Sequence, residues 1–243
     1  MSFKTTLIAV AFGLTGTAVA SEQVDNIAQK LTEITGFAVE SVNESTAGLY
    51  EIVTDKGIFY ATEDGKHLFN GSLHAFEDGL SNITQQRKID VAEGRINRIK
   101  DDFVSYPAAN EKHELMVFFD TTCGYCRKMH NEISRYNALG ITINYAIWPR
   151  QGVFMRGSKV HTQSYKNMES IVCSSNPAMS MNMVMRDTPI EQASCENTIV
   201  DSYNLGQWLE VSGTPAVYDM KGNLVSRGYL PPEAMLKTLE GRG

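Results

Sequence analysis

The sequence predicts two folded modules, a small α+β module at the N-terminus and a larger α/β domain, with a helix between them. Three observations support this fold class. Short β-type runs separated by glycine-bearing turns occupy the first part of the chain, a proline-free segment with helical periodicity follows, and strand and helix patterns alternate from His113 onward. At ~150 residues per domain, a chain of 243 residues is long enough for two modules.

Composition and charge narrow the classes of function. With 42% hydrophobic and 21% charged residues, the chain has the composition of an ordinary folded protein, which excludes wholesale disorder. Its formal net charge is −6. Because the neutralisation of phosphates requires clustered lysine and arginine, we expect no nucleic acid among its partners.

The first 20 residues have the pattern of a secretory signal peptide. Lys4 precedes the apolar run Leu7–Leu14, and the small residues of Ala18–Ala20 end the segment. The run is shorter than the ~20 residues of a membrane-spanning helix. We expect cleavage after Ala20 and export to an oxidising compartment, in which cysteines can pair. The alternative is an apolar N-terminal helix of a cytosolic protein.

Residues 21–82 are expected to form the small module. Val24–Ile34 has the apolar spacing of one helical face, and three strand-like runs follow it. Glycine-bearing turns separate these runs and indicate an antiparallel meander of Leu49–Thr54, Ile58–Thr62 and His67–Asn70. A module of this size has a thin core, and pairing with another chain would stabilise it. We therefore expect a dimerisation domain that joins two copies of the chain.

Residues 83–105 are expected to form a linker helix. Apolar residues recur at spacings of three and four and would share one stripe: Ile89, Ala92, Ile96, Ile99 and Phe103. As a helix, the segment Ile83–Phe103 would be ~30 Å long, and Gly94 would allow a kink within it. The alternative is a helix packed entirely inside one domain.

Residues 106–243 are expected to form the larger domain. Its order is strand, helix, strand, a helical insertion, two strands and a last helix, at Leu115–Phe119, Cys123–Leu139, Ile141–Trp148, Ser158–Leu209, Ala216–Met220, Leu224–Tyr229 and Pro231–Leu239. This βαβ, insertion, ββα order is typical of a thioredoxin-like domain.

The motif Cys123-Gly124-Tyr125-Cys126 stands between the first strand of this domain and a helix. Helix-terminal N–H groups and the helix dipole favour negative charge, so we expect a lowered pKa for Cys123, the attacking thiol. Cys126, one turn later, would resolve the mixed disulfide. The alternatives are a structural disulfide and half of a zinc site. No second C-x-x-C motif exists, and we expect neither a metal nor another cofactor.

Cys173 and Cys195 lie 22 residues apart in the helical insertion. In an oxidising compartment they are expected to form a structural disulfide, which would stabilise the fold by ~3 kcal/mol in the chain-entropy model. A second redox-active pair is the alternative.

Thr214 and Pro215 precede a strand, at the position where a thioredoxin-like domain has a cis proline beside its C-x-x-C motif. The backbone before such a proline can pair with a bound peptide, so both residues are candidates for substrate binding. Leu115–Phe119 contains no acidic residue that could accept the proton of Cys126. Solvent or another, unidentified group would have to do so.

Several of these motifs resemble the DsbC family of bacterial periplasmic disulfide isomerases. The similar segments are Asp64–His67, Thr122–Cys126, Tyr136–Thr142, Pro149–Gly152, the pair Cys173 and Cys195, and Gly213–Val217. The resemblance implies a V-shaped homodimer joined through its N-terminal modules, with chaperone activity. It also implies periplasmic localisation, misfolded exported proteins with non-native disulfides as substrates, and a membrane thiol reductase as electron donor.

Three other functions remain open at this point. The first is a reductase that protects single cysteines of exported proteins from sulfenic acid. A related protein with that activity usually has proline after the first cysteine, so Gly124 favours the isomerase. The second is a net oxidase, whose cysteine pair would stay oxidised in the cell. The third is a non-catalytic chaperone, which the intact C-x-x-C motif argues against.

Overall fold

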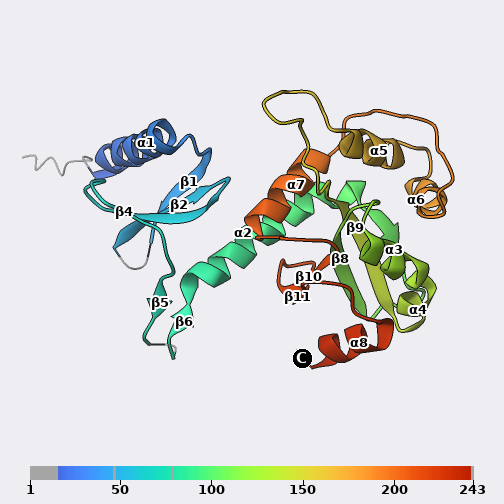
Figure 1. The fold of residues 1–243 in the computed structure, drawn as a ribbon. Coiled ribbons are helices and arrows are strands. Elements are labelled where there is room, and N and C mark those ends of the chain that lie inside the picture. Colours follow the sequence, from blue (N-terminus) through green and yellow to red (C-terminus); the bar gives the residue numbers. More distant parts are fainter. Residues whose placement is uncertain (1–15, 46–47, 78, 242–243) are drawn as a thin grey trace, which may run out of the picture. The chain divides into compact units, whose positions relative to one another are not determined.

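The computed structural model describes residues 16–45, 48–77 and 79–241 (Figure 1). It contains two compact units, Met1–Gly71 and Ser72–Gly243. Residues 1–15 of the expected signal peptide lie outside the described ranges. No helix within those ranges is both long and apolar enough to cross a membrane.

In the first unit, one helix packs on an antiparallel sheet whose strand order is β1-β2-β3-β4 (Figure 1). The elements are α1 (Gly16–Thr35), β1 (Val39–Glu44), β2 (Leu49–Thr54), β3 (Gly57–Thr62) and β4 (Leu68–Phe69). Buried side chains from the helix and the sheet form one core: Ile27, Leu31, Tyr50, Ile52 and Ala61. The predicted helix and antiparallel meander are confirmed.

Strand β1 was not predicted from the sequence. It lies at the edge of the sheet, where it pairs only with β2. None of its six residues is buried. Val39 and Val42 pack partly against the core, but a register shift after Val39 leaves them three positions apart, so the sequence VESVNE shows no alternation of apolar and polar residues.

The second unit begins with a two-stranded ribbon, β5 (His74–Ala75) and β6 (Ser81–Asn82), and continues into α2 (Ile83–Ile99). Asn82 caps this helix, because its side-chain oxygen accepts a hydrogen bond from the Gln85 amide at 2.8 Å. Gly94 does not interrupt the helix. A short 3-10 turn over Lys100–Asp102 ends it before Phe103.

The second half of α2 packs inside the second unit. Ala92, Ile96 and Ile99 are buried there. The Arg95 guanidinium lies 4.0 Å from the ring centroid of Trp208, the last residue of α7 (Ile199–Trp208). The alternative of a helix packed within one domain therefore describes this half of α2. The predicted helix that follows the small module in the chain is confirmed, and its apolar stripe packs within the second unit.

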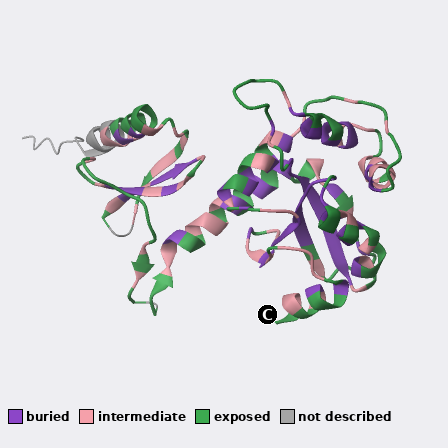
Figure 2. Cartoon of the chain, viewed as in Figure 1, coloured by how far each residue is buried: buried purple, intermediate pink, exposed green. Residues whose placement is uncertain are grey.

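The sheet of the second unit has the order β11-β10-β8-β9-β7. Its strands are β7 (Val104–Tyr106), β8 (His113–Phe119), β9 (Ile141–Ile147), β10 (Ala216–Asp219) and β11 (Leu224–Ser226). The central pair, β8 and β9, is parallel, and the other pairs are antiparallel. Both central strands are mostly buried (Figure 2). Because β7 pairs with β9, this domain begins before residue 106.

Three helices form the predicted insertion between β9 and β10: α5 (Gln163–Val172), α6 (Pro177–Met185) and α7. The single helix expected over Cys123–Leu139 is divided into α3 (Gly124–Asn131) and α4 (Ile133–Ala138). Glu132 separates them with a non-helical backbone. Its carboxylate accepts hydrogen bonds from Arg135 and from the Tyr229 hydroxyl. The chain ends with α8 (Pro232–Glu240), so the thioredoxin-like α/β fold with a helical insertion is confirmed.

Candidate active site

The two cysteines of the C-x-x-C motif lie at the beginning of α3, shortly after the end of β8. Cys123 is the N-cap residue of α3 and has an extended backbone, whereas Cys126 lies in the first helical turn. Both are free thiols. Cys126 is fully buried and Cys123 is 5% exposed, while Tyr125 between them is 63% exposed. The first cysteine is thus the one closer to solvent.

Thr214 and Pro215 lie beside Cys123. Strand β10 pairs with β8, with Ala216 opposite Phe118, and this pairing brings the residues before β10 to the end of β8. The Cys123 thiol donates a hydrogen bond of 3.1 Å to the Thr214 carbonyl. The Thr214–Pro215 peptide bond is cis. Sheet pairing therefore gathers the four central site residues that the sequence singled out.

The two thiols have opposite pKa shifts. Desolvation raises the pKa of Cys123, but hydrogen bonds with Thr214, Cys126 and Tyr125 outweigh it, and the net pKa lies below the ordinary value. Desolvation dominates at Cys126 and raises its pKa well above that value. At neutral pH, thiolate therefore forms more readily at Cys123 than at Cys126. A nucleophilic thiolate next to a protonated partner is what two-step disulfide exchange requires.

Asp120 is a site residue that sequence analysis missed. It follows β8 directly and is fully buried. Its carboxylate accepts hydrogen bonds from the Thr122 amide (2.7 Å) and hydroxyl (2.6 Å) and from the Arg150 amide (2.8 Å). Its backbone carbonyl accepts one from the Cys123 amide at 3.1 Å. Asp120 thus holds the loop before α3. It lies one residue beyond Leu115–Phe119, the segment in which the sequence analysis found no acidic residue.

A disulfide joins Cys173, after α5, to Cys195, in the loop before α7, with Cα atoms 5.6 Å apart. Buried Glu169 braces the same loop. It accepts hydrogen bonds from the Ser194 hydroxyl (3.0 Å) and the Asn197 amide (3.3 Å). The loop is thereby held to α5 at two points.

No group of three or more potential metal ligands comes together anywhere in the described part of the chain. Cys126 and His130, which share a helical face, are not part of such a group.

Two family models match the chain. A disulfide bond isomerase protein N-terminal domain matches residues 17–85, and a thioredoxin-like domain matches residues 99–242. A crystal structure of a disulfide interchange protein from Neisseria gonorrhoeae aligns with a TM-score of 0.48 and 20% identity, over 58% of this chain and 95% of that one.

Curated relatives are similar over most of the chain. The thiol:disulfide interchange protein DsbC of Dickeya dadantii is 34% identical over 232 residues, which is 95% of this chain and 92% of the relative. DsbC of Escherichia coli (strain K12) is 37% identical over 194 residues, or 80% of this chain and 78% of that protein. The chain belongs to the DsbC family.

As a DsbC family member, the chain is a thiol:disulfide interchange enzyme, a disulfide isomerase. Its C-x-x-C pair lies in the thioredoxin-like domain, after β8. The predicted family, enzyme class and fold class are confirmed. Membership also separates the chain from the non-catalytic chaperone that the sequence had left open.

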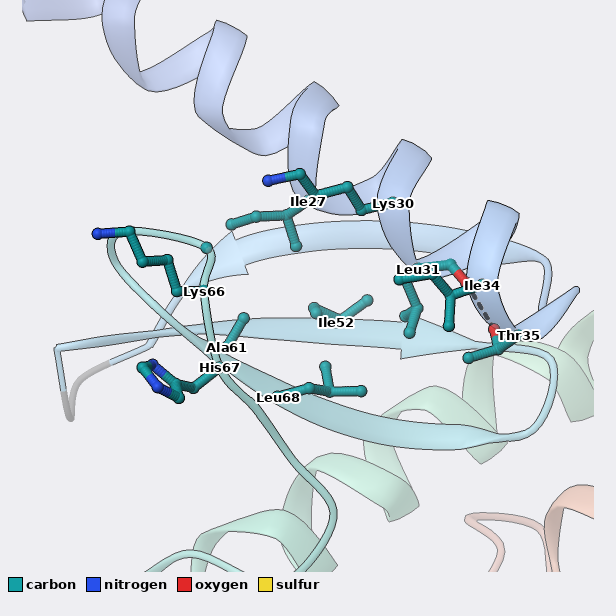
Figure 3. A pocket seen from close by; sticks show the side chains of 11 residues that line it. Ile27, Lys30, Leu31, Ile34, Thr35, Ile52, Ala61, Lys66, His67 and Leu68 are labelled. Carbon is teal, nitrogen blue, oxygen red and sulfur yellow. Dashed lines mark hydrogen bonds between the residues drawn. The ribbon is translucent and has the colours of Figure 1, made fainter.

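The N-terminal unit of this DsbC family member has a pocket of about 350 Å³ (Figure 3). Apolar side chains of α1 and of the sheet line it, among them Ile27, Leu31 and Ile52, and the Lys30 and Lys66 amino groups point away from it (Figure 3). Ile34 and Leu68 at its border are 82% and 47% exposed. This unit thus leaves apolar surface uncovered within a single chain.

Proposed function

We propose that Cys123 attacks non-native disulfides and that Cys126 resolves the resulting mixed disulfide. The opposite pKa shifts of the two thiols carry this assignment. Attack by the Cys123 thiolate joins Cys123 to one substrate sulfur and releases the other as a thiolate. The substrate can then rearrange and displace Cys123, which is isomerisation. If it stalls, Cys126 displaces it and leaves the enzyme oxidised.

Thr214 and Pro215 form the proposed substrate-binding edge, with Gly124 and Tyr125 in the active-site loop. The hydrogen bond from Cys123 to the Thr214 carbonyl supports this, because any chain joined to the Cys123 sulfur has to pass beside that backbone. Exposed Tyr125, whose ring stacks on Tyr229 at 6.4 Å, supplies an apolar surface at the entrance. Binding through the backbone does not require a pocket that selects one substrate side chain, which suits an enzyme that acts on many different proteins.

We assign a structural role to the Cys173–Cys195 disulfide. It ties α5 to a loop that has little regular structure of its own. We assign the redox-active role to the free pair Cys123 and Cys126. This pair lies at the beginning of α3, and the pKa of its first thiol, Cys123, is lowered.

The proposed location is the periplasm, after removal of the signal peptide behind Ala20. There the enzyme would act on misfolded exported proteins with non-native disulfides and assist them as a chaperone. Because isomerisation requires a free thiolate at Cys123, an electron donor has to keep the pair reduced in an oxidising compartment. We propose a membrane thiol reductase for this role.

The proposed assembly is a homodimer joined through the N-terminal units. Exposed apolar side chains of that unit support it: Ile34 (82%), Leu68 (47%) and Phe69 (50%). Two sites that share one substrate raise its effective concentration at each thiolate. The proposed division is a dimerisation domain of residues 21–82, a linker helix of residues 83–105 and a catalytic domain of residues 106–243; the two compact units of the structure meet in the chain at Gly71 and Ser72.

Refolding of a scrambled multi-disulfide substrate tests this function, with the mature chain compared with a fragment of residues 72–243. A fragment cut at Tyr106 would lose α2 and two residues of β7, so Ser72 is the better starting point. We expect the fragment to be monomeric by light scattering, to reduce simple disulfides, and to lose most isomerase and chaperone activity. A fragment that isomerises as well as the dimer would refute the role of the N-terminal unit.

Acid trapping and alkylation in cells should find Cys123 and Cys126 reduced; an oxidised pair would indicate an oxidase.

A further inference from the structure

His130 lies directly behind the resolving cysteine. It follows Cys126 by four residues on α3, so the two side chains share one helical face. Helical side chains lean toward the N-terminus of their helix, which directs the imidazole toward Cys126. Its ring centroid lies 6.4 Å from that of Phe119, the last residue of β8. Both His130 and Cys126 are buried.

The hydrogen bonds of His130 leave one ring nitrogen free. The Asn182 side chain hydrogen-bonds the imidazole, and its oxygen also accepts a bond of 3.1 Å from the Tyr106 hydroxyl. The ring nitrogen Nδ1 is buried and has no hydrogen-bond partner among the described residues. Because the interaction with Asn182 raises the pKa of His130, the amide oxygen is its acceptor, and we assign the donor to Nε2, since Nδ1 has no partner among the described residues. This fixes the tautomer in which Nδ1 carries a lone pair.

The other titratable groups around His130 cannot accept a proton in its place. Tyr106 from β7 and Tyr145 from β9 contact its ring, the charge of Arg186 after α6 acts on it, and Cys126 precedes it by four residues on the same helix. Burial raises the pKa of Tyr106 and of Tyr145, so both phenols keep their protons. Burial, with a smaller contribution from the Arg186 charge, lowers the pKa of His130, so its imidazole is neutral at pH 7.

Asp120 is the nearest buried acid in the sequence, but its carboxylate already accepts hydrogen bonds from Thr122 and Arg150. Those hydrogen bonds hold the loop before α3, and they occupy the carboxylate oxygens of Asp120. The Nδ1 atom of His130 has no such bond to any residue that the structure describes. A buried polar atom without a partner in a native fold needs a functional explanation.

We propose that His130 is the base that takes the proton of Cys126 when Cys126 resolves the mixed disulfide. In this step the Cys126 S–H bond breaks and its proton moves to Nδ1. The Cys126 sulfur bonds to the Cys123 sulfur, and the bond from Cys123 to the substrate sulfur breaks. The electron pair of that bond leaves with the substrate sulfur, which takes the proton from the imidazolium. Both cysteines are oxidised and the substrate sulfur is reduced. This inference rests on the proposed roles of Cys123 and Cys126.

The test separates attack by Cys123 from release by Cys126. The reduced, full-length protein is mixed with glutathione disulfide, quenched in acid at successive times, and analysed by mass for the mixed disulfide and the enzyme disulfide. Attack depends on the glutathione disulfide concentration, whereas release does not. His130→Gln is compared with the wild type and with His113→Gln, a control in β8 of the same domain.

We expect His130→Gln to slow release at pH 7 by ~10²-fold, the low end for a general base, and to leave the attack rate unchanged. Release in this variant should rise tenfold per pH unit, because hydroxide then removes the proton. In the wild type, release should be nearly independent of pH once the imidazole is neutral. The control should behave as the wild type.

Asn182→Ala provides a second variant if His130→Gln folds poorly. This variant keeps the His130 imidazole but removes the interaction that favours the tautomer with a free Nδ1 lone pair. Release should therefore slow by less than in His130→Gln, and the pH profile should keep its wild-type shape. Equal release rates and parallel pH profiles in the wild type and His130→Gln would overturn the inference, as would attack and release slowing in proportion. If the wild type formed no mixed disulfide at Cys123, the proposed function itself would fail.

Discussion

The Cys123 thiol and the Thr214 carbonyl lie 3.1 Å apart although 91 positions separate them in the chain. The pairing of β10 with β8 produces this contact. It places the attacking sulfur against the backbone on which a substrate would lie. A separate interaction, with the Thr214 side chain, is one of those that lower the pKa of Cys123. Substrate positioning and thiol activation thus depend on the same residue, Thr214, through its backbone and its side chain respectively.

Replacement of each active-site cysteine should separate the two steps of exchange. Cys123→Ser should abolish refolding of a scrambled substrate, because Cys126 is buried and keeps its proton. Cys126→Ser should still attack but accumulate mixed disulfides, visible on non-reducing gels. Equal accumulation by both variants would contradict the assigned roles.

The reactivity of Cys123 should depend on pH with a midpoint below the ordinary pKa of a thiol, because the pKa of Cys123 is lowered. Desolvation opposes ionisation, but the hydrogen bonds to the sulfur outweigh it. Because the folded pKa is the lower one, the thiolate stabilises the reduced protein above the unfolded pKa, and this contribution is lost as pH falls through the folded pKa. Iodoacetamide labelling across pH, with mass mapping, measures the midpoint. Cys126 should stay unlabelled and serves as the internal control; a midpoint at or above the ordinary value would refute the prediction.

Removal of the Cys173–Cys195 bridge should affect stability more than chemistry. The double variant Cys173→Ala with Cys195→Ala should lose ~3 kcal/mol of unfolding free energy, because the unfolded chain gains the freedom of an open loop. Urea unfolding measures this loss, and glutathione exchange at Cys123 should persist. Loss of exchange in a variant that remains folded would assign this pair a redox role.

The packing of α2 on the catalytic unit can be tested at Gly222, in the turn between β10 and β11. Its φ is +96°, and an added Cβ would lie 2.7 Å from the Cβ of Ala92 on α2. Gly222→Ala should therefore destabilise the protein by ~1–3 kcal/mol. Gly228→Ala is the matched control, because its φ is not positive and the methyl carbon it would gain has no described atom within 4 Å beyond its chain neighbours.

A double-mutant cycle isolates the contact between the helix and the turn. Ala92→Gly removes the methyl group that Gly222→Ala would meet, so the double variant should be more stable than the sum of the single changes predicts. Thermal unfolding of the four proteins measures the coupling. Additive effects would show that α2 does not pack against this turn.

The sequence by itself determined the local features of this protein. Hydrophobic periodicity located α2 and the central strands, and the C-x-x-C motif located the beginning of α3, because these signals depend on neighbours only a few residues away. Edge strand β1 gave no signal because its two valines that pack on the core, Val39 and Val42, are three positions apart. The break at Glu132 was missed because its partners, Arg135 and Tyr229, include one that is 97 positions distant.

Only the tertiary structure decided which distant residues complete the site. Strand pairing brought Thr214 to Cys123, and the buried bonds of Asp120 shaped the loop before α3. The packing of α2 was decided by two contacts, of Arg95 with Trp208 and of Ala92 with Gly222. The spacing of Cys126 and His130 was visible from the start, but its meaning required the knowledge that Nδ1 is buried and has no partner among the described residues. Burial and hydrogen-bond satisfaction are properties of the packed chain, so no local pattern could supply them.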